Sequence, residues 1–412
     1  MKHSLLILLQ IIFGCLIVSG CQKDDPIDDG PNDRQLITLT RGQEICKDNS
    51  NEFSFQLLEK IESSHKGKSY FFSPMSVEFA LGLLGEGVDG KTRGQILEAL
   101  GIENMDDFNS FASSMLKTLP SLDKKTKVVL SNLALSNSSL GIEFKKDYTN
   151  SVERIFDATV KSMDFSSKKT VSFVNDWGSK NTEGKIKNIG DYLSASQDLF
   201  LANAIYFKGS WCIDYFNKAK TKKGEFTKED GSKVKRDMME CTGGLAYGVY
   251  DKHVVGSLSY GNSSFVMTIC LPLPGYTVSD IISDVPDGLS GKVKPLVNGP
   301  VDTFKMPKFQ GNYRLNLAGP LTSLGITELF NKGNTDFGGM TNHTPCYISG
   351  LMQDSFISID ENGTEAAAIT IVANGMVANL NFNDFIVDRP FLYVIREIST
   401  GTILFMGKYA GE

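Results

Sequence analysis

The stretch NAIYFKGSW, residues Asn203–Trp211, completes an apolar run that begins at Asp198 as DLFLANAIYF. This run predicts a β-strand, and because both of its faces are apolar we expect the strand at the centre of a sheet. Asn203 is costly inside such a strand unless its amide group finds hydrogen-bond partners. Trp211 closes the segment with a large ring, which indicates an ordered strand end. The segment by itself indicates a core strand held in place by polar contacts.

The sequence before this strand is mainly helical in pattern, and the sequence after it is mainly strand-like. Apolar residues recur at helical spacing after Asn49 or Ser50, either of which is suited to cap a helix. In FFSPMSVEFALGLL, Ser73 is a good N-cap for a helix that starts at Pro74. No linker, repeat or low-complexity segment divides residues 41–412. These patterns predict an α+β fold in one large domain.

The motif GEGVDGKT, residues 85–92, matches the G-x-x-x-x-G-K-[ST] pattern of nucleotide-binding phosphate loops. Such a loop follows a strand and precedes a helix, so that backbone amides face the phosphate. The residues before Gly85 have a helical pattern, so the glycines are better explained as a turn between two helices, the second ending at Gly101. The sequence also contains neither a G-x-S-x-G elbow nor an H-E-x-x-H motif. We therefore expect neither an enzyme nor a nucleotide-binding protein.

Charge and histidine content argue against other functions. The chain of 412 residues has a formal net charge of −6, a pI of about 5.5 and no basic stripe that would attract nucleic acid. His65, His253 and His343 are expected to be solvated surface residues rather than catalytic bases, although a Ser–His–Asp triad is assembled in space and leaves no sequence motif.

Cysteine spacing predicts neither a disulfide framework nor a metal site. Of the seven cysteines, two lie near the N-terminus and five are widely spaced, with no C-x-x-C pair. We expect these five to be small buried thiols, and we expect no metal and no cofactor. They are Cys46, Cys212, Cys241, Cys270 and Cys346.

The N-terminus has the features of an export signal, which we exclude from the fold. A positively charged start precedes an apolar core, Ser4–Val18, that is too short for a membrane-spanning helix. The residues VSGC, Val18–Cys21, resemble the lipobox at which bacteria cut before a cysteine and lipidate it; a plain secretory signal is the alternative. We therefore expect a signal peptide at 1–20, a lipid on Cys21 and a flexible tether at 21–45. Because the acidic run CQKDD resembles the export signal of some surface lipoproteins, we expect an outward-facing protein of the bacterial outer membrane.

A second stretch, GTEAAAITIVANGMVANLNF at Gly363–Phe382, combines an alanine run that suits a helix with β-branched residues that suit a strand. Asn374–Gly375 lies between two apolar runs, which is the usual signal for a hairpin turn. Residues 366–383 contain no charge and no proline, so they are an aggregation hazard if they are exposed. Composition alone does not explain why the chain carries this segment.

Seven short motifs, taken together and in order, resemble those of the serpin family. They are FFSPMSV (Phe71–Val77), TEGKI (Thr182–Ile186), NAIYFKGSW (Asn203–Trp211), MPKF (Met306–Phe309), ENGTEAAAIT (Glu361–Thr370), DRPFLYVI (Asp388–Ile395) and TGTILFMGKY (Thr400–Tyr409). The resemblance covers essentially all of residues 49–411. It implies a serpin domain at 46–412 with three β-sheets, eight or nine helices and an exposed reactive-centre loop near the C-terminus.

The resemblance also implies an inhibitory mechanism. In inhibitory serpins a protease attacks the exposed loop and becomes acylated, and the cut loop inserts as a new strand of the main sheet and traps the protease. The second stretch suits such a loop, because an inserting strand uses every backbone N–H and tolerates no proline. Alternation would bury Thr364, Ala366 and Ala368 on one face and leave Glu365 in water. Because the hinge residues are small, the resemblance implies an inhibitor, and this interpretation replaces that of a hairpin. The implied hinge residues are Glu361, Gly363, Thr364, Glu365, Ala366, Ala367 and Ala368.

Further residues match positions that control loop insertion in the family. Ser73, Ser76 and Asn203 match a polar cluster beneath the sheet. The family usually completes this cluster with a histidine, but the matching residue here is Gln353, whose amide still donates and accepts hydrogen bonds. Trp211 matches the aromatic residue where insertion begins. Lys308 and Glu361 match a hinge-side ion pair that, if partly exposed, contributes little to stability. The matching positions are Ser73, Ser76, Asn203, Trp211, Lys308 and Gln353.

Two ways of counting place the cleaved bond differently. Counting from the hinge places it between Val377 and Ala378, with Met376 just before. Counting back from Pro390 places it nearer Asn379, because this loop is longer than usual. Apolar Met376 and Val377 suit elastase-like serine proteases, with papain-like cysteine proteases as a further class, and Asn379 suits an asparagine-specific cysteine protease. We therefore expect a monomeric inhibitor of elastase-like proteases. The alternative is a non-inhibitory binding or carrier module with the same fold.

Overall fold

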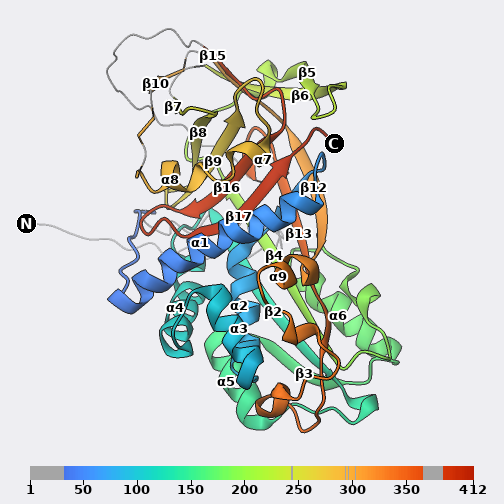
Figure 1. Cartoon of the computed structure of the whole chain (residues 1–412). Helices are drawn as coiled ribbons and strands as arrows, with labels where there is room; N and C mark the ends of the chain where they lie inside the picture. The colour runs from blue at the N-terminus through green and yellow to red at the C-terminus, as the bar shows by residue number, and fades with distance from the viewer. Residues whose placement is uncertain (1–31, 243–244, 293, 296, 302, 365–383) are drawn as a thin grey trace, which may run out of the picture. The chain divides into compact units, whose positions relative to one another are not determined.

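Nine α-helices are present in the part of the chain that the computed structural model describes, which is residues 32–412 except 243–244, 293, 296, 302 and 365–383 (Figure 1). The first six helices are the longest and all end by Asn181, in agreement with the helical pattern of the early sequence. The helices are α1 (Arg41–Ser64), α2 (Pro74–Gly85), α3 (Gly90–Leu100), α4 (Met105–Thr118), α5 (Lys146–Phe156), α6 (Lys168–Asn181), α7 (Val278–Ile281), α8 (Val285–Leu289) and α9 (Ala318–Ser323).

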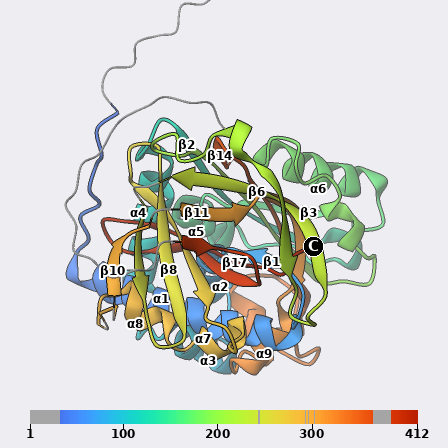
Figure 2. The same cartoon turned by 90° about the horizontal axis from the view of Figure 1, so that it is seen from above.

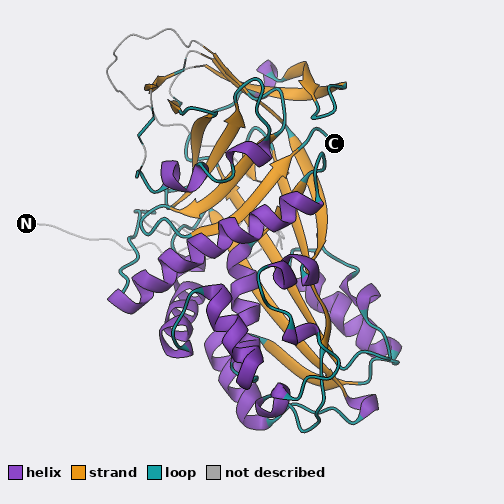
Figure 3. Cartoon of the chain, in the orientation of Figure 1, coloured by secondary structure: helices purple, strands orange, loops and turns teal. Residues whose placement is uncertain are grey.

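Three β-sheets accompany the helices within these described residues (Figure 3). The main sheet is formed, in spatial order, by β12 (Phe309–Asn316), β13 (Ile348–Ile359), β4 (Leu199–Ser210), β2 (Thr126–Asn137) and β3 (Thr159–Met163), with β14 (Gly363–Thr364) paired to β4. The seven-stranded sheet has the order β1 (Tyr70–Phe72), β17 (Ile403–Tyr409), β16 (Phe391–Glu397), β9 (Phe265–Pro272), β8 (His253–Tyr260), β7 (Ala246–Val249) and β10 (Val297–Pro300). The four-stranded sheet has the order β15 (Asp384–Ile386), β11 (Thr303–Pro307), β6 (Lys233–Thr242) and β5 (Lys222–Thr227). Within the described ranges, three sheets and nine helices confirm the predicted α+β fold.

The segment LFLANAIYF lies in β4, at the centre of the main sheet. Strand β4 pairs antiparallel with β2 and parallel with β13, and nearly all of its side chains are buried. The strand and its central position are therefore as the apolar sequence predicted, because a strand with neighbours on both edges and cover on both faces has no surface for water.

Helices cover the main sheet on both faces, with α2 on one side and α6 on the other (Figures 1 and 2). The side chains of β4 alternate between two apolar clusters, as those of any strand must. Asn203 falls on the α2 face. The β4 residues in the large core that includes α2 are Leu199, Leu201, Ile205 and Phe207, and those in the cluster that includes α6 are Phe200, Ala202 and Ala204.

Helix α1 begins earlier than its sequence pattern suggested. Thr40 is its N-cap: the Thr40 hydroxyl accepts a hydrogen bond from the backbone N–H of Gln43, and the Gln43 side chain accepts one from the N–H of Thr40. This capping box satisfies two N–H groups at the helix start. The expected cap at Asn49 or Ser50 is therefore wrong, and the expected tether at 21–45 overlaps the first turn of α1.

The motif GEGVDGKT forms the junction between α2 and α3, as the turn interpretation predicted. Helix α2 starts at Pro74 with Ser73 as its cap, and α3 ends at Gly101, whose φ of 64° is left-handed. Thr92, the residue that would bind the metal in a phosphate loop, donates its hydroxyl to Asp336 Oδ2 at 2.9 Å. The motif therefore sits in a helix–turn–helix arrangement and not in the strand–loop–helix that phosphate binding needs.

Burial corrects the expectation for one histidine and supports the expectation for most cysteines. His253 is only 1% exposed, stacks on Tyr250 with ring centroids 4.8 Å apart, and is not a solvated residue. Burial lowers the pKa of His253. Cys46, Cys241, Cys270 and Cys346 are buried thiols, whereas Cys212 is a partly exposed thiol.

Candidate functional site

The short strand β14 places two of the expected hinge residues at one end of the main sheet. Gly363–Thr364 pairs antiparallel with residues 209–210 at the end of β4. Further along β4, residues 201–206 pair directly and in parallel with residues 351–356 of β13. We call this line between β13 and β4 the seam. Strand β14 therefore lies where a new strand would enter the seam.

Glycine is required at position 363. Its φ is 130°, a conformation that side-chain-bearing residues rarely adopt, and a Cβ atom there would lie 2.3 Å from the carbonyl oxygen of Gly209. The close approach of the two backbones lets β14 start immediately after the turn at Asp360–Asn362.

Trp211 fastens the end of β4 to the turn that precedes β14. Its indole Nε1 donates to the carbonyl oxygen of Asp360 at 3.1 Å, and its backbone N–H donates to the carbonyl oxygen of Asn362, also at 3.1 Å. The indole stacks on Tyr260 with ring centroids 4.6 Å apart, and the Tyr260 hydroxyl lies 3.1 Å from that of Thr364. The aromatic residue expected where insertion begins therefore contacts the base of the expected hinge.

Glu361 is held by residues from two other elements. Lys308 Nζ donates to its Oε2 at 2.8 Å, and the Thr221 hydroxyl donates to its Oε1 at 2.7 Å. Burial alone would raise the pKa of Glu361, but the hydrogen bonds from Lys308 and Thr221 outweigh it and hold the pKa below its ordinary value. The ion pair expected from the sequence is present. The Glu361 side chain, however, is only 5% exposed against 38% for Lys308, and Thr221 is a partner that no sequence pattern indicated.

Gln353 joins β13 to the start of α2. Its Oε1 accepts from the backbone N–H of Ser73 at 2.9 Å, and its Nε2 donates to the carbonyl oxygen of Ser73 at 3.0 Å. The Ser73 hydroxyl in turn accepts from the N–H of Ser76 at 3.1 Å. All three side chains are buried. Three of the residues predicted to cluster beneath the sheet are therefore together, and Gln353 uses both ends of its amide.

Asn203 has a different partner from the one the sequence suggested. It lies in register with Gln353 on one side and with Asn132 of β2 on the other, and it donates its Nδ2 to Asn132 Oδ1. Its own Oδ1 is buried without a partner among the described residues. Asn132 was not singled out from the sequence, although it carries the same signal as Asn203, an amide inside the apolar strand pattern VVLSNLAL.

Several expected site residues lie outside the described residues, so their roles remain predictions. The undescribed site residues are Cys21, Glu365, Ala366, Ala367, Ala368, the turn Asn374–Gly375, Met376, Val377, Ala378 and Asn379.

Among the residues that the structure describes, no helix combines the length and the apolar character needed to cross a bilayer.

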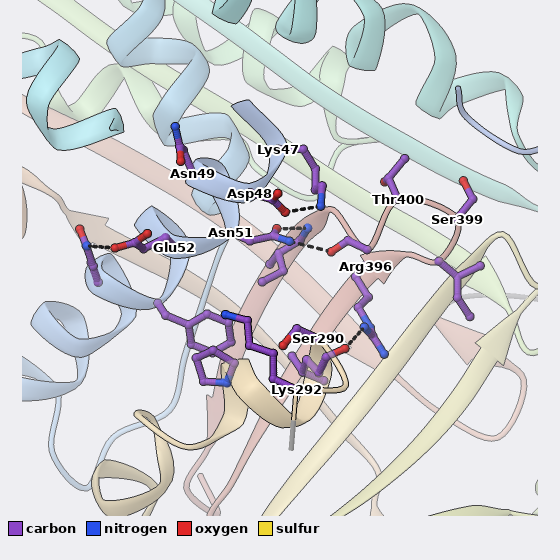
Figure 4. A pocket seen from close by; sticks show the side chains of 17 residues that line it. Lys47, Asp48, Asn49, Asn51, Glu52, Ser290, Lys292, Arg396, Ser399 and Thr400 are labelled. Atoms are coloured by element: carbon purple, nitrogen blue, oxygen red, sulfur yellow. Dashed lines mark hydrogen bonds and ion pairs between the residues drawn. The ribbon is translucent and has the colours of Figure 1, made fainter. Parts of the chain in front are cut away.

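A cavity of about 740 Å³ lies between α1, α8 and the turn that joins β16 to β17 (Figure 4). Charged side chains line it, including Arg396 and the ion pair of Lys47 with Asp48. Asn51 donates to the carbonyl oxygen of Gly401 at 3.0 Å and so links α1 to the turn. The lining includes none of the described residues that were expected at the hinge.

The family is established by comparison with known proteins. The family model for serpins, described as serine protease inhibitors, matches residues 48–411. The chain therefore belongs to the serpin family, whose members are generally protease inhibitors and not catalysts.

Individual relatives cover nearly the whole chain. Serpin I2 of Homo sapiens is 30% identical over 385 residues, which cover 90% of this chain and 94% of that protein. Iripin-1 of Ixodes ricinus is 30% identical over 370 residues, covering 87% and 93%. The crystal structure of the thermophilic serpin tengpin in the native state matches with a TM-score of 0.79 at 25% identity, covering 92% of this chain and 97% of that chain. A complex of thyroxine-binding globulin with thyroxine shares the fold, with a TM-score of 0.77 at 24% identity over 89% and 98% of the two chains.

Proposed function

We propose that this protein inhibits elastase-like serine proteases by suicide-substrate trapping, in which the cleaved loop inserts along the seam. Protease inhibition is the general activity of the family. The elastase-like target is proposed because Met376 and Val377, before the expected bond, are apolar and medium-sized. Papain-like cysteine proteases are a further candidate class, and the inhibitor is proposed to act as a monomer without a cofactor.

The observation that carries this proposal is the direction of β14. Strand β14 runs antiparallel to β4, whereas β13 and β4 are parallel to each other. A loop that continued along β14 would therefore replace one parallel pairing with two antiparallel pairings, which are slightly more stable per residue. Lengthening β14 along the seam is thus favourable for the backbone, provided that β13 and β4 can part.

The side chains along the seam favour parting. Gln353 on β13 takes its hydrogen bonds from Ser73 of the α2 cap, and Asn203 on β4 donates to Asn132 of β2. None of these hydrogen bonds therefore links β13 directly to β4, and the Asn203–Asn132 bond, which lies within the β4–β2 pair, survives when β13 parts from β4. Buried amides that had to lose their partners would oppose opening, because each would be left unsatisfied.

The test is to mix the purified protein with pancreatic elastase in equal amounts and to look for a higher-mass complex that survives SDS. N-terminal sequencing of the released C-terminal fragment then identifies the cleaved bond, which we expect between Val377 and Ala378. Cleavage by elastase without a stable complex would contradict the trapping mechanism. Cleavage nearer Asn379 would move the specificity away from Val377.

A matched pair of arginine variants separates insertion from recognition. Thr364 is 1% exposed and faces Tyr260, so Thr364→Arg should block insertion while leaving the cleavage site intact. Asn362 is exposed two residues earlier, so Asn362→Arg should still form the complex. If Thr364→Arg traps elastase as well as Asn362→Arg does, inhibition does not depend on burying this hinge residue.

We further propose that the protein is exported, loses residues 1–20, carries a lipid on Cys21 and faces outward from a bacterial outer membrane. The lipobox-like VSGC and the acidic CQKDD support this proposal. Cells that express the wild type should incorporate labelled palmitate into the protein, and cells that express Cys21→Ala should not. Equal labelling of both proteins would contradict lipidation at Cys21, and protection from added proteinase K on intact cells would contradict outward exposure.

A second candidate function is that of a non-inhibitory carrier, and the 740 Å³ cavity is the observation that favours it. Thyroxine-binding globulin, named in one solved complex with this fold, is itself a binding protein. The two functions differ in how the protein responds to cleavage of its loop. A large rise in melting temperature after cleavage supports insertion and inhibition, whereas an unchanged melting temperature supports the carrier.

A further inference from the structure

Asp354 is a buried carboxylate that is only half satisfied. It lies on β13 next to Gln353, and it faces the α6 side of the sheet opposite Arg314 of β12. Arg314 Nε donates to its Oδ1 at 2.8 Å, but Oδ2 is buried without a partner among the described residues. The side chain of Asp354 is 9% exposed. An ionised oxygen that is removed from water without a hydrogen bond is costly, so this arrangement destabilises the closed structure.

The segment between α6 and β4 keeps Asp354 covered. We call residues 182–193 the cover segment. Arg314 Nη2 donates to the carbonyl oxygen of Asn188 at 3.2 Å, and its guanidinium lies 4.2 Å from the centre of the Tyr192 ring. The cover segment thus contacts β12 and β13 through Arg314.

The same cover segment packs on the other side of the seam. Ile186 and Ile189 belong to the apolar cluster that contains Ala202 and Ala204 of β4. The cover segment therefore spans the seam, with apolar contacts and the Tyr206–Glu183 hydrogen bond to β4 on one side, and the contacts of Arg314 on the other. When β13 parts from β4, one set of these contacts has to shift.

The charged groups that face Asp354 come from two elements. Arg314 projects from β12, and Lys185, Lys187 and Asp191 belong to the cover segment; the two lysines also line a cavity of about 380 Å³ together with Asp354. From β4 the residue in register with Asp354 is Ala204, which carries no charge. The cavity gives water a short path to Asp354 once the cover segment moves.

We infer that Asp354 is a positioning residue for loop insertion: its ionised, half-satisfied carboxylate favours movement of the cover segment and opening of the seam. This inference rests on the proposed inhibitory function. Opening exposes Oδ2 to water, so the free energy that the closed structure spends on burying this oxygen is recovered in the open one.

The pKa of Asp354 agrees with this direction. Burial raises the pKa of Asp354 from 3.8 to about 6, while Arg314 lowers it and Asp191 raises it. In the open state, water reaches the carboxylate and its pKa returns toward 3.8. The closed state therefore binds the proton more tightly, and its stability relative to the open state is complete below pH 3.8 and is lost as the pH rises through 6. If the whole shift is released, the opening equilibrium changes by up to about a hundredfold.

Amide hydrogen exchange of the uncleaved protein tests this inference without a protease. In the wild type, protection factors of the cover segment and of β13 should fall between pH 4.5 and 7.5, by up to about twenty-fivefold. Asp354→Asn, which imitates the protonated form, should keep the acid-state protection at both pH values. Asp176→Asn, which removes an exposed carboxylate from α6, should behave as the wild type does. The inference is overturned if Asp354→Asn keeps the wild-type pH dependence, or if wild-type protection rises with pH.

A second measurement links opening to trapping. At pH 7.5, the reaction of Asp354→Asn with elastase should give more cleaved inhibitor and less trapped complex than the reaction of the wild type, because the seam of the variant opens more slowly. If the ratio of trapped complex to cleaved inhibitor is unchanged while the cleavage rates are equal, the role of Asp354 in insertion is overturned. If the wild type itself traps no elastase, the proposed function fails, and the exchange data alone still decide whether Asp354 opens the cover segment.

Discussion

Replacing Gln353 by methionine tests how strongly this residue fastens β13 to α2. Methionine is unbranched and similar in volume, so Gln353→Met preserves the packing and removes only the two hydrogen bonds to the backbone of Ser73. The carbonyl oxygen of Ser73 still accepts from the N–H of Val77 at 3.3 Å, whereas the N–H of Ser73 loses its partner at 2.9 Å in a buried position.

These contacts set the size of the expected effect. Two net hydrogen bonds contribute about 1 kcal/mol each, and an unsatisfied buried N–H adds about 1 kcal/mol or more. We therefore expect the free energy of unfolding to fall by about 2 to 4 kcal/mol, which is a factor of about 30 to 1000 in the equilibrium constant. Because neither glutamine nor methionine titrates, the loss should be the same at pH 6 and pH 8.

Urea unfolding followed by circular dichroism measures the loss, and the decay of elastase inhibition on warming reports whether β13 has loosened. Gln310→Met is the matched control, because Gln310 is exposed on the neighbouring strand β12 and its replacement should change the free energy of unfolding by less than about 0.5 kcal/mol. The reasoning is refuted if Gln353→Met unfolds at the same urea concentration as Gln310→Met.

Three further changes test other parts of the site and core. Glu361→Gln weakens the bond from Lys308 and should cost about 1 kcal/mol at pH 7, since Lys308 is 38% exposed and the pair is partly screened. Because the pKa of Glu361 is lowered below 4.5, the wild type loses this stability only as the pH falls below that value. The urea midpoints of the wild type and of Glu361→Gln should therefore differ at pH 7 and converge at pH 3. Burial raises the pKa of Glu78 to about 8, so the stability that protonated Glu78 contributes is complete below pH 4.5 and is lost as the pH rises through 8. Glu78→Gln should therefore flatten the dependence of melting temperature on pH across this window. An unchanged dependence contradicts this prediction. Gly363→Ala places a Cβ 2.3 Å from a carbonyl oxygen of β4 and should speed amide exchange at the end of β4 at least tenfold, whereas Gly275→Ala, also at positive φ but with no heavy atom within 4 Å of the Cβ, should leave that exchange unchanged.

The position of β4 and the start of α2 were predictable because both depend on neighbours in the sequence. The apolar run around NAIYF permits only a strand that is covered on both faces, and it lies at the centre of the main sheet. The pair Ser73–Pro74 caps a helix through the N–H groups of its own first turn. The start of α1 is equally local, and the capping box at Thr40 with Gln43 is a recognisable pattern that the acidic composition of the preceding segment obscured.

The sequence by itself therefore determined the family and the fold class, because periodicity, capping and motif order are all carried by residues close together in the chain. Only the tertiary structure decided the partners of the polar residues. Asn132 meets Asn203, Thr221 meets Glu361 and Arg314 meets Asp354 across 71, 140 and 40 residues of sequence. The first and third pairs depend on strand register, because a shift of one residue would turn their side chains to the opposite face of the sheet, whereas the second depends on where the turn after β13 lies. Burial then decides what each pair contributes, because the same carboxylate that is harmless in water is costly beneath the cover segment.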